Sequence, residues 1–160
     1  MTGTTTLVTG ATGFVGGHLL DRLADGGPVI AWYRPDGTPP DLTRHVDWMP
    51  VDLLDRLAVT RALDEIAPAR VYHLAGAPQV DTSWQNVVPH LRANVLATHY
   101  LLEGVRRLSD PCRVLVVSSS QVYQVTDEPI SEDTPLLPSS PYGLSKLAQD
   151  QLAQRGCQED

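Results

Sequence analysis

The sequence predicts an α/β fold, a doubly wound parallel sheet covered by helices on both faces. Short runs of apolar and β-branched residues alternate with helical patterns along most of the chain. This alternation is typical of parallel strands joined by crossover helices. The first run, Leu7–Thr9, is followed at once by glycines at three-residue spacing, Gly10, Gly13 and Gly16. The expected architecture therefore has three layers: helices, sheet and helices.

The three glycines lie between the first strand and a helix expected at His18–Leu23. Gly10 permits a tight turn, Gly13 lets the backbone approach a diphosphate, and Gly16 lets the helix pack closely on its own strand. The helix N-terminus adds free N–H groups and a partial positive charge. This arrangement predicts a dinucleotide site of the Rossmann type. An ordinary strand-to-helix turn that uses glycine is the alternative.

Composition limits the classes of protein to consider. The chain has 160 residues, 42% of them hydrophobic, so residues 1–160 suffice for one domain with a sizeable core. A net charge of −7 disfavours a general surface for nucleic acid or anionic membranes. Cys112 and Cys157 lie in no metal-ligand pattern, and we expect two free thiols in a reducing compartment. The sequence shows no signal peptide and no membrane span, which predicts a cytoplasmic protein.

The second strand, Val29–Tyr33, ends directly before Arg34. In dinucleotide sites this strand end faces the adenosine ribose, where a basic residue suits the 2′-phosphate of NADP and an acidic one the 2′-hydroxyl of NAD. Arg34 therefore favours NADP(H), with NAD(H) still open because Asp36 follows two residues later. A solvated loop charge is the third interpretation of Arg34.

The middle of the chain adds two strands and a helix. The third strand is Val46–Val51, and Asp52 after it is expected to cap the helix Leu54–Ile66 or to bond the adenine amino group. The fourth strand, Val71–Gly76, ends in small residues that suit a backbone lying against a flat cofactor. His73 on this strand is expected to be a structural histidine rather than a catalytic one.

The second half carries the polar residues that suit chemistry. Val88–Leu108 is expected to form one long helix, with Asn94 beside its apolar face, either solvated or bonded to nearby backbone. The strand Arg113–Val117 leads into Ser118–Ser120. Ligands bind off the carboxyl ends of strands in open parallel sheets, so these hydroxyls are well placed for chemistry. Local hydroxyl caps in a loop are the alternative.

A last helix is predicted to open at Ser139-Ser140-Pro141, with a hydroxyl cap and proline in the first turn. Tyr142 and Lys146 lie four residues apart on it and so share one face. The alternative is an exposed pair on the helix surface.

With these elements in order, the chain resembles the extended short-chain dehydrogenase/reductase family, which includes the NAD-dependent epimerases and dehydratases. The resemblance covers nearly the whole chain. It rests on six motifs, which are Thr9–Gly16, Asp52–Leu53, His73–Gly76, Asn94, Val117–Tyr123 and Tyr142–Lys146.

The resemblance implies that Ser119, Tyr142 and Lys146 are catalytic. Tyr142 would exchange a proton with the substrate oxygen, and Lys146 would favour its phenolate and hold the nicotinamide ribose. Ser119 would hydrogen-bond the reacting oxygen, while a hydride passes between the nicotinamide and a sugar carbon. The implied cofactor-binding residues are Gly10, Thr12, Gly13, Phe14, Val15, Gly16, Arg34, Asp52, Leu53, Leu74, Ala75, Gly76, Asn94, Tyr142 and Lys146. No metal site is implied.

Within the family the chain is most similar to GDP-4-keto-6-deoxymannose reductases and GDP-mannose 4,6-dehydratases. The similar residues are His73–Gly76, Val80, Ser83, Trp84 and Pro129–Leu136. Dehydratases of this group carry an acidic residue at the position of Gln121, and an amide cannot serve as a base. The resemblance therefore implies reduction or epimerisation of a nucleotide sugar. Gln124 replaces a frequent glycine and changes the local loop.

Full-length members of the family are about twice as long, with a second lobe for the substrate. We therefore expect residues 1–160 to be the cofactor-binding part, ending before a sixth strand and leaving one sheet edge unpaired. A homodimer through the helices of Asn94 and Tyr142 is also implied. Two functions stay open: an NAD(P)-dependent oxidoreductase or epimerase on nucleotide sugars, or a non-catalytic dinucleotide-binding module or truncated remnant.

Overall fold

The computed structural model describes residues 4–23, 25–40, 46–77, 84–85 and 87–156. The chain forms two compact units. The first comprises residues 1–75 and 100–116, and the second comprises residues 76–99 and 117–160. The predictions for Val80, Ser83 and Cys157 lie outside the described residues.

The first unit is built on a five-stranded parallel sheet, as predicted. Its strands are β1 (Thr6–Thr9), β2 (Val29–Tyr33), β3 (Val46–Pro50), β4 (Arg70–His73) and β5 (Arg113–Val116). They lie in the order β3-β2-β1-β4-β5 and all pair in parallel. Consecutive strands run outward from β1 in both directions, so the carboxyl end of β1 lies where the order reverses. That is where doubly wound sheets bind their ligands.

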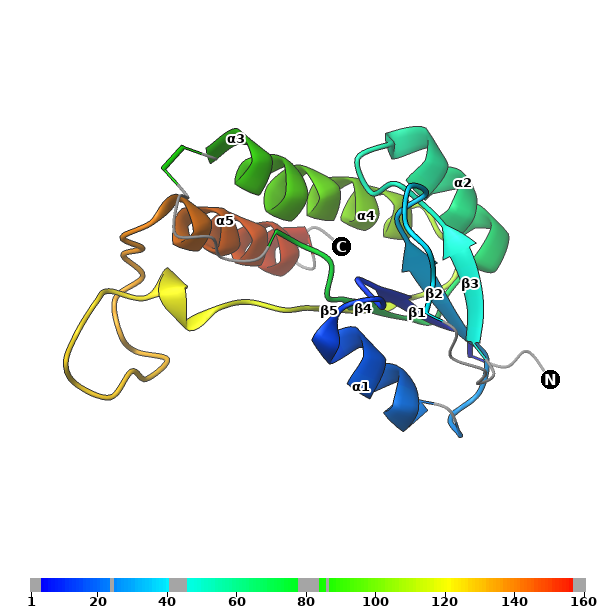
Figure 1. Ribbon diagram of the computed structural model, residues 1–160, viewed down its shortest axis with the longest axis horizontal. Coiled ribbons are helices and arrows are strands. Elements are labelled where there is room, and N and C mark those ends of the chain that lie inside the picture. Colours follow the sequence, from blue (N-terminus) through cyan, green and yellow to red (C-terminus); the bar gives the residue numbers. More distant parts are fainter. Residues whose placement is uncertain (1–3, 24, 41–45, 78–83, 86, 157–160) are drawn as a thin grey trace. The chain divides into compact units, whose positions relative to one another are not determined.

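The two faces of β1 support two separate apolar cores. Leu7 packs in one core with Leu63 of α2 (Arg56–Ile66), and Val8 packs in the other with Leu20 of α1 (Phe14–Leu23). Figure 1 shows α1 and α2 on opposite faces of the sheet. Because successive strand residues point to opposite faces, a continuous apolar run such as that of β1 needs cover on both.

Both helices begin at other residues than the sequence predicts. Helix α1 begins at Phe14 rather than His18, so Gly16 and Gly17 lie inside it. Helix α2 begins at Arg56, and Asp55 rather than Asp52 caps it, by accepting the N–H groups of Leu57 and Ala58. It ends at Ile66, as the sequence predicts, and the residue after it, Ala67, has a left-handed backbone (φ 39°) and an N–H bonded to the carbonyl of Leu63.

The second unit is mostly helical. The long helix predicted from Val88 is interrupted by a π-helical segment, η1 (Leu91–Leu96), which follows α3 (Val87–His90) and leads into α4 (Ala97–Val105). Helix α5 (Pro141–Gly156) lies beside α3 and contacts η1 (Figure 1). The described ranges contain no helix long and apolar enough to cross a membrane.

Strand β5 lies at the sheet edge, paired with β4 on one side. Leu115 in this strand is 49% exposed, an unusual value for an apolar residue of a parallel sheet. Among the described residues, this strand order agrees with the expectation that one edge of the sheet is unpaired.

Candidate functional site

The glycine turn has the geometry that its sequence predicts. Gly10 has a φ of +68°, and a Cβ at this position would lie 2.6 Å from the backbone nitrogen of Ala75 at the end of β4. Only glycine fits there without strain, because the conformation is left-handed and the space is filled by backbone. The turn therefore holds the ends of β1 and β4 together.

The other two glycines bring the helix close to the turn. A Cβ on Gly16 would lie 2.5 Å from the carbonyl oxygen of Gly10, and one on Gly13 would lie 3.2 Å from the same oxygen. Helix α1 thus starts directly above the turn. Its first residue, Phe14, is 84% exposed, and Thr12 and Val15 are exposed as well. The N-terminal N–H groups of α1 therefore face an open surface, where an anion can bind.

Arg34 lies at the end of β2 and pairs with Asp36. The guanidinium Nε is 3.7 Å from the carboxylate oxygen of Asp36, and both side chains are largely exposed. A 2′-phosphate at Arg34 would approach this carboxylate as well. Asp52 is exposed and its side chain accepts the N–H of Leu54 at 2.9 Å, so it closes a local turn instead of capping α2. Leu53 beside it is half-buried against the core of the first unit.

His73 is buried at the end of β4 with Thr9 as a partner. Its Nδ1 lies 2.7 Å from the hydroxyl of Thr9, across the pairing of β4 with β1. The backbone N–H of Leu74 bonds the carbonyl of Thr9 at 3.2 Å, which continues the pairing into Ala75. These contacts support the expected structural role of His73.

Asn94 is fully buried in the π-helical segment of the second unit. Its side-chain oxygen accepts the N–H of Ala77 at 2.8 Å, and its amide nitrogen donates to the hydroxyl of Ser145 at 2.9 Å. A Cβ on Gly76 would lie 2.6 Å from the Asn94 oxygen, so a side chain at this position would displace the Asn94 amide. Of the two expectations for Asn94, contact with nearby backbone is confirmed and solvation is wrong.

The serine cluster is placed by α5 and a short 3₁₀ turn, η2 (Ser120–Val122). Ser119 caps this turn, its hydroxyl oxygen accepting the N–H of Gln121 at 3.2 Å. The proton of that hydroxyl is not used in the cap and can be donated elsewhere. Ser118 donates to the carboxylate of Asp150 on α5. The cluster therefore combines a local hydroxyl cap with a side-chain contact to the helix.

Tyr142 and Lys146 lie on α5 one turn apart. Ser140 caps this helix through the N–H of Gly143 at 3.0 Å, as predicted. The ring of Tyr142 meets the ring of His90 edge-on, with centroids 5.9 Å apart. Lys146 is only 6% exposed, and its Nζ donates to the carbonyl of Val117 at 2.6 Å. The interpretation of an exposed pair is wrong for Lys146 and does not fit the half-buried Tyr142.

Burial sets the electrostatics of the lysine. Loss of hydration lowers the pKa of Lys146 from its ordinary value, and the nearby carboxylate of Asp150 acts in the opposite direction. Elsewhere, burial raises the pKa of the free Cys112 thiol. The described residues contain no group of three His, Cys, Asp or Glu that could hold a metal ion.

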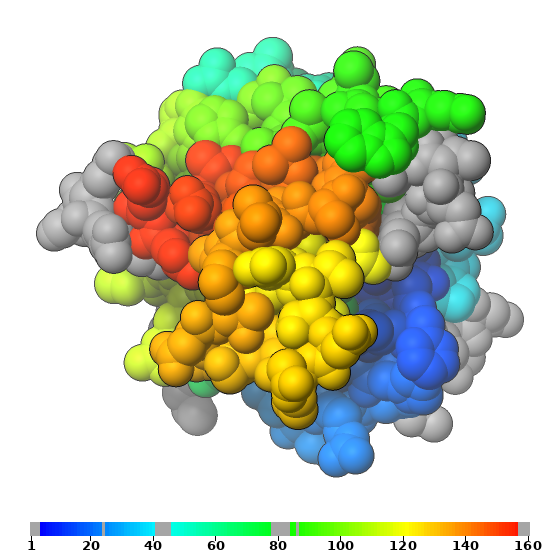
Figure 2. All heavy atoms as spheres, turned by 90° about the vertical axis from the view of Figure 1, so that its left-hand side faces the viewer, coloured from blue at the N-terminus to red at the C-terminus, as the bar shows by residue number. Residues whose placement is uncertain are grey.

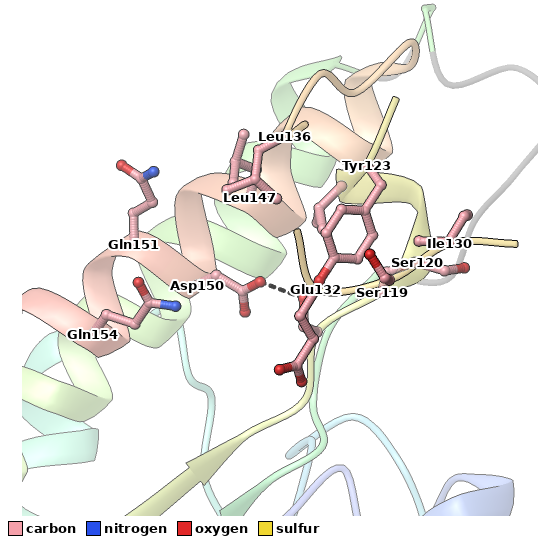
Figure 3. A pocket seen from close by; sticks show the side chains of 13 residues that line it. Ser119, Ser120, Tyr123, Ile130, Glu132, Leu136, Leu147, Asp150, Gln151 and Gln154 are labelled. Carbon is pink, nitrogen blue, oxygen red and sulfur yellow. Dashed lines mark hydrogen bonds between the residues drawn. The ribbon is translucent and has the colours of Figure 1, made fainter. Parts of the chain in front are cut away.

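A cavity of about 780 Å³ opens beside Ser119 in the second unit. Figure 3 shows the carboxyl groups of Glu132 and Asp150 and the ring of Tyr123 around it. In Figure 2 the segment of residues 120–140, yellow to orange, lies against α5 on the same face. The described lining residues include two carboxylates and no basic side chain. This cavity is therefore unsuited to a diphosphate.

The candidate residues thus form two groups. The glycine turn, Arg34, Asp52 and Leu74–Ala75 belong to the first unit, and the second unit holds Gly76 with the residues of α3–η1, η2 and α5. Sequence reasoning missed the partners of Lys146. Gln149, three residues after it, is fully buried and accepts from the Lys146 ammonium. A polar residue on the same helix face was the available signal.

Comparison with known proteins identifies the family. A family model described as GDP-mannose 4,6 dehydratase matches residues 7–158. The chain belongs to this family. Its relatives are named as dehydratases and epimerases of nucleotide sugars, some of the solved structures contain NAD, and the names do not agree on a GDP sugar. The dTDP-glucose 4,6-dehydratase of Xanthomonas campestris pv. campestris (strain B100) is 34% identical over 166 residues, covering 92% of this chain and 47% of the relative.

Solved structures give the same picture. The structure of MoeE5 in complex with UDP-glucuronic acid and NAD is 40% identical, with a TM-score of 0.84 over 95% of this chain and 49% of the other. The UDP-glucuronic acid 4-epimerase of Bacillus cereus, in complex with UDP-glucuronic acid and NAD, is 30% identical, with a TM-score of 0.84 over 97% of this chain and 52% of the other. The chain spans about half the length of these relatives.

Proposed function

We propose that this chain is the cofactor-binding and Ser–Tyr–Lys part of an NAD-dependent enzyme that epimerises or reduces a nucleotide sugar. The observation that carries the proposal is the buried amine of Lys146, one helical turn from Tyr142. A lysine side chain is rarely buried unless something requires its charge there. Similarity to NAD-bound structures of nucleotide-sugar enzymes supports the same assignment.

The residues of the first unit fit NAD. The turn at Gly10–Gly16 has space for backbone and none for a Cβ at its two ends, and the exposed start of α1 offers N–H groups to a diphosphate. Thr12–Val15 and Leu74–Ala75 would lie along the cofactor, and Asp52 with Leu53 would lie at its adenine. When bound, NAD supplies the acceptor and donor of a hydride.

We propose NAD rather than the NADP(H) expected from Arg34. The similar structures name NAD, and none of the comparisons supports a preference for NADP. The carboxylate of Asp36, 3.7 Å from the guanidinium of Arg34, would repel a 2′-phosphate and could accept from a 2′-hydroxyl.

The proposed chemistry assigns one proton movement to Tyr142. Its phenolate takes the proton of a sugar hydroxyl, or its phenol returns a proton to the sugar carbonyl. In this proposal the ammonium of Lys146 stabilises the anion formed on Tyr142, because a cation in a site with little water stabilises a nearby anion.

Ser119 and Gln121 set the class of reaction in this proposal. The Ser119 hydroxyl accepts from Gln121 and keeps its own proton for the reacting sugar oxygen. The Gln121 side chain is an amide and cannot take a proton from a sugar ring carbon. We therefore assign epimerisation or 4-keto reduction, although several relatives are named as dehydratases.

The test combines NAD binding with turnover. We expect the chain to bind NAD in a calorimetric titration, and Tyr142→Phe to keep this binding. Turnover is measured on UDP-glucuronic acid and UDP-glucose by the chain and by Tyr142→Phe, and we expect the variant to lose it. NAD binding without turnover in either protein would favour the alternative, a dinucleotide-binding module. Failure to bind NAD would overturn both.

A further inference from the structure

A chain of buried polar groups leads away from the amine of Lys146. The Nζ atom donates to the carbonyl of Val117 at 2.6 Å and to the side-chain oxygen of Gln149. The Gln149 amide nitrogen donates to the hydroxyl of Thr98 at 2.7 Å. That hydroxyl donates to the carbonyl of Asn94 at 2.6 Å. All the residues in this chain of hydrogen bonds belong to the second unit.

The direction of these bonds fixes the orientation of the Gln149 amide. The Thr98 hydroxyl has one proton, which goes to the carbonyl of Asn94, so toward Gln149 it can only accept. The NH₂ group of Gln149 must therefore face Thr98, and its oxygen must face Lys146. Gln149 and Thr98 are both 0% exposed, so water does not compete for these positions.

We propose that Gln149 is a positioning residue that holds the Lys146 ammonium in place, with Thr98 fixing its amide. The value of this contact for catalysis rests on the proposed function. An ammonium has three N–H donors, and Val117 and Gln149 accept two of them among the described residues. The third N–H remains for a bound cofactor or substrate.

The composition of the chain suggests that this position needs the amine of a lysine side chain. Of the 12 lysine and arginine residues in the sequence, Lys146 is the only lysine. A guanidinium is planar and carries five N–H donors, so it could not be satisfied by two acceptors arranged around a compact charge. The position therefore requires lysine in a chain that otherwise uses arginine.

The single lysine also makes the experiment selective. Protein grown with isotope-labelled lysine gives one lysine side-chain signal by NMR, and its titration reports Lys146 alone. Three variants are compared with the wild type. Gln149→Met removes the acceptor at similar length, Gln149→Glu keeps the shape and adds a negative charge, and Gln151→Met is the matched control at an exposed position of α5.

The expected shifts have opposite signs. An acceptor favours the charged amine, so Gln149→Met should move the titration midpoint to lower pH and Gln149→Glu to higher pH, while Gln151→Met leaves it unchanged. A variant that merely loosens the helix would hydrate the amine and raise the midpoint in both cases. Unchanged midpoints, or a rise with Gln149→Met, would overturn the proposal.

A second arm links the contact to the proposed function. In NAD titrations, Gln149→Met should weaken binding about tenfold, the usual scale for a lost hydrogen bond to a charged group, and Gln151→Met should not. If the wild type binds no NAD, the proposed function fails while the NMR shifts still decide the role of Gln149. If NAD binds and Gln149→Met neither moves the midpoint nor weakens binding, the inference fails and the function stands.

Discussion

Because the amine of Lys146 is buried, we expect the free energy of unfolding of this protein to vary with pH in the alkaline range. The pKa of Lys146 is lowered by burial, so between that value and 10.5 the unfolded chain binds more protons than the folded one. Stability rises with pH wherever the unfolded state binds more protons. We therefore expect the free energy of unfolding of the wild type, relative to Lys146→Met, to increase as the pH rises from the lowered pKa of Lys146 toward 10.5.

Urea unfolding of both proteins at several pH values measures this difference. Working with the difference cancels the other titrating groups, and it also removes the constant contribution of the bonds lost in Lys146→Met. A flat difference would mean that Lys146 titrates alike in the folded and unfolded chains, and a falling one would mean that the folded state favours the ammonium.

Cofactor choice is also decided at single residues. Replacing Arg34 by alanine removes the partner of Asp36 and the positive charge that favours a 2′-phosphate at the end of β2. We expect Arg34→Ala to change NAD affinity less than about twofold and to weaken any NADP affinity about tenfold. Calorimetry with both nucleotides measures this. A greater loss of affinity for NAD than for NADP would contradict the parts assigned to Arg34 and Asp36.

The sequence shows the residue types of the candidate site but not the burial of their side chains. The pattern Tyr142–Lys146 and the position of Asn94 are visible in it. Asn94 and Gln149 are polar residues on helices, which are usually exposed. Their burial depends on α5 packing against η1, a contact between segments about 50 positions apart. Sequence periodicity carries no information on that contact.

At the scale of elements, the packing of α1 on the glycine turn can be tested at two neighbouring glycines of this helix, one in contact with the turn and one not. A Cβ on Gly16 would lie 2.5 Å from the Gly10 oxygen, whereas one on Gly17 meets nothing within 4 Å. We expect Gly16→Ala to lower the free energy of unfolding by about 1–3 kcal/mol through overpacking. Gly17→Ala should raise it by about 0.5–1 kcal/mol, because alanine loses less backbone entropy in a helix.

Denaturant unfolding of the two variants measures both changes, and NAD titration shows whether the turn is affected. Two similar losses of stability would mean that helix geometry, not the contact with Gly10, limits both positions. A neutral Gly16→Ala would contradict the close approach of α1 to the turn.

The type and order of elements followed from the sequence, and their ends did not. The five strands are short apolar runs bounded by turn residues, and Ser140 with Pro141 marks the start of α5. The start of α1 at Phe14 was missed because Gly16 and Gly17 have low helix propensity, which the packing on β1 overrides. The π-helical segment was missed because the spacing of Leu91, Val95, Leu102 and Val105 also fits one face of an uninterrupted α-helix.

At the scale of the whole molecule, the association of the chain stays a prediction. The family resemblance implies a homodimer through the helices of Asn94 and Tyr142. Val88 on α3 is 65% exposed and Leu144 on α5 is 53% exposed, both in the second unit. Exposed apolar side chains on two adjacent helices suit the buried centre of an interface.

We therefore expect the chain to sediment as a dimer, and Leu144→Glu to raise the dimer dissociation constant at least about tenfold, because it would bury a carboxylate without a partner. Leu137→Glu is the control, since Leu137 is equally apolar and exposed but lies outside the helices. Sedimentation velocity over a range of concentrations measures both variants. Dissociation by Leu137→Glu alone would place the interface on the loop before α5, and a monomeric wild type would contradict the dimer. Because Leu144 lies between Tyr142 and Lys146 on α5, NAD titration of the same variants tests whether association and cofactor binding depend on each other.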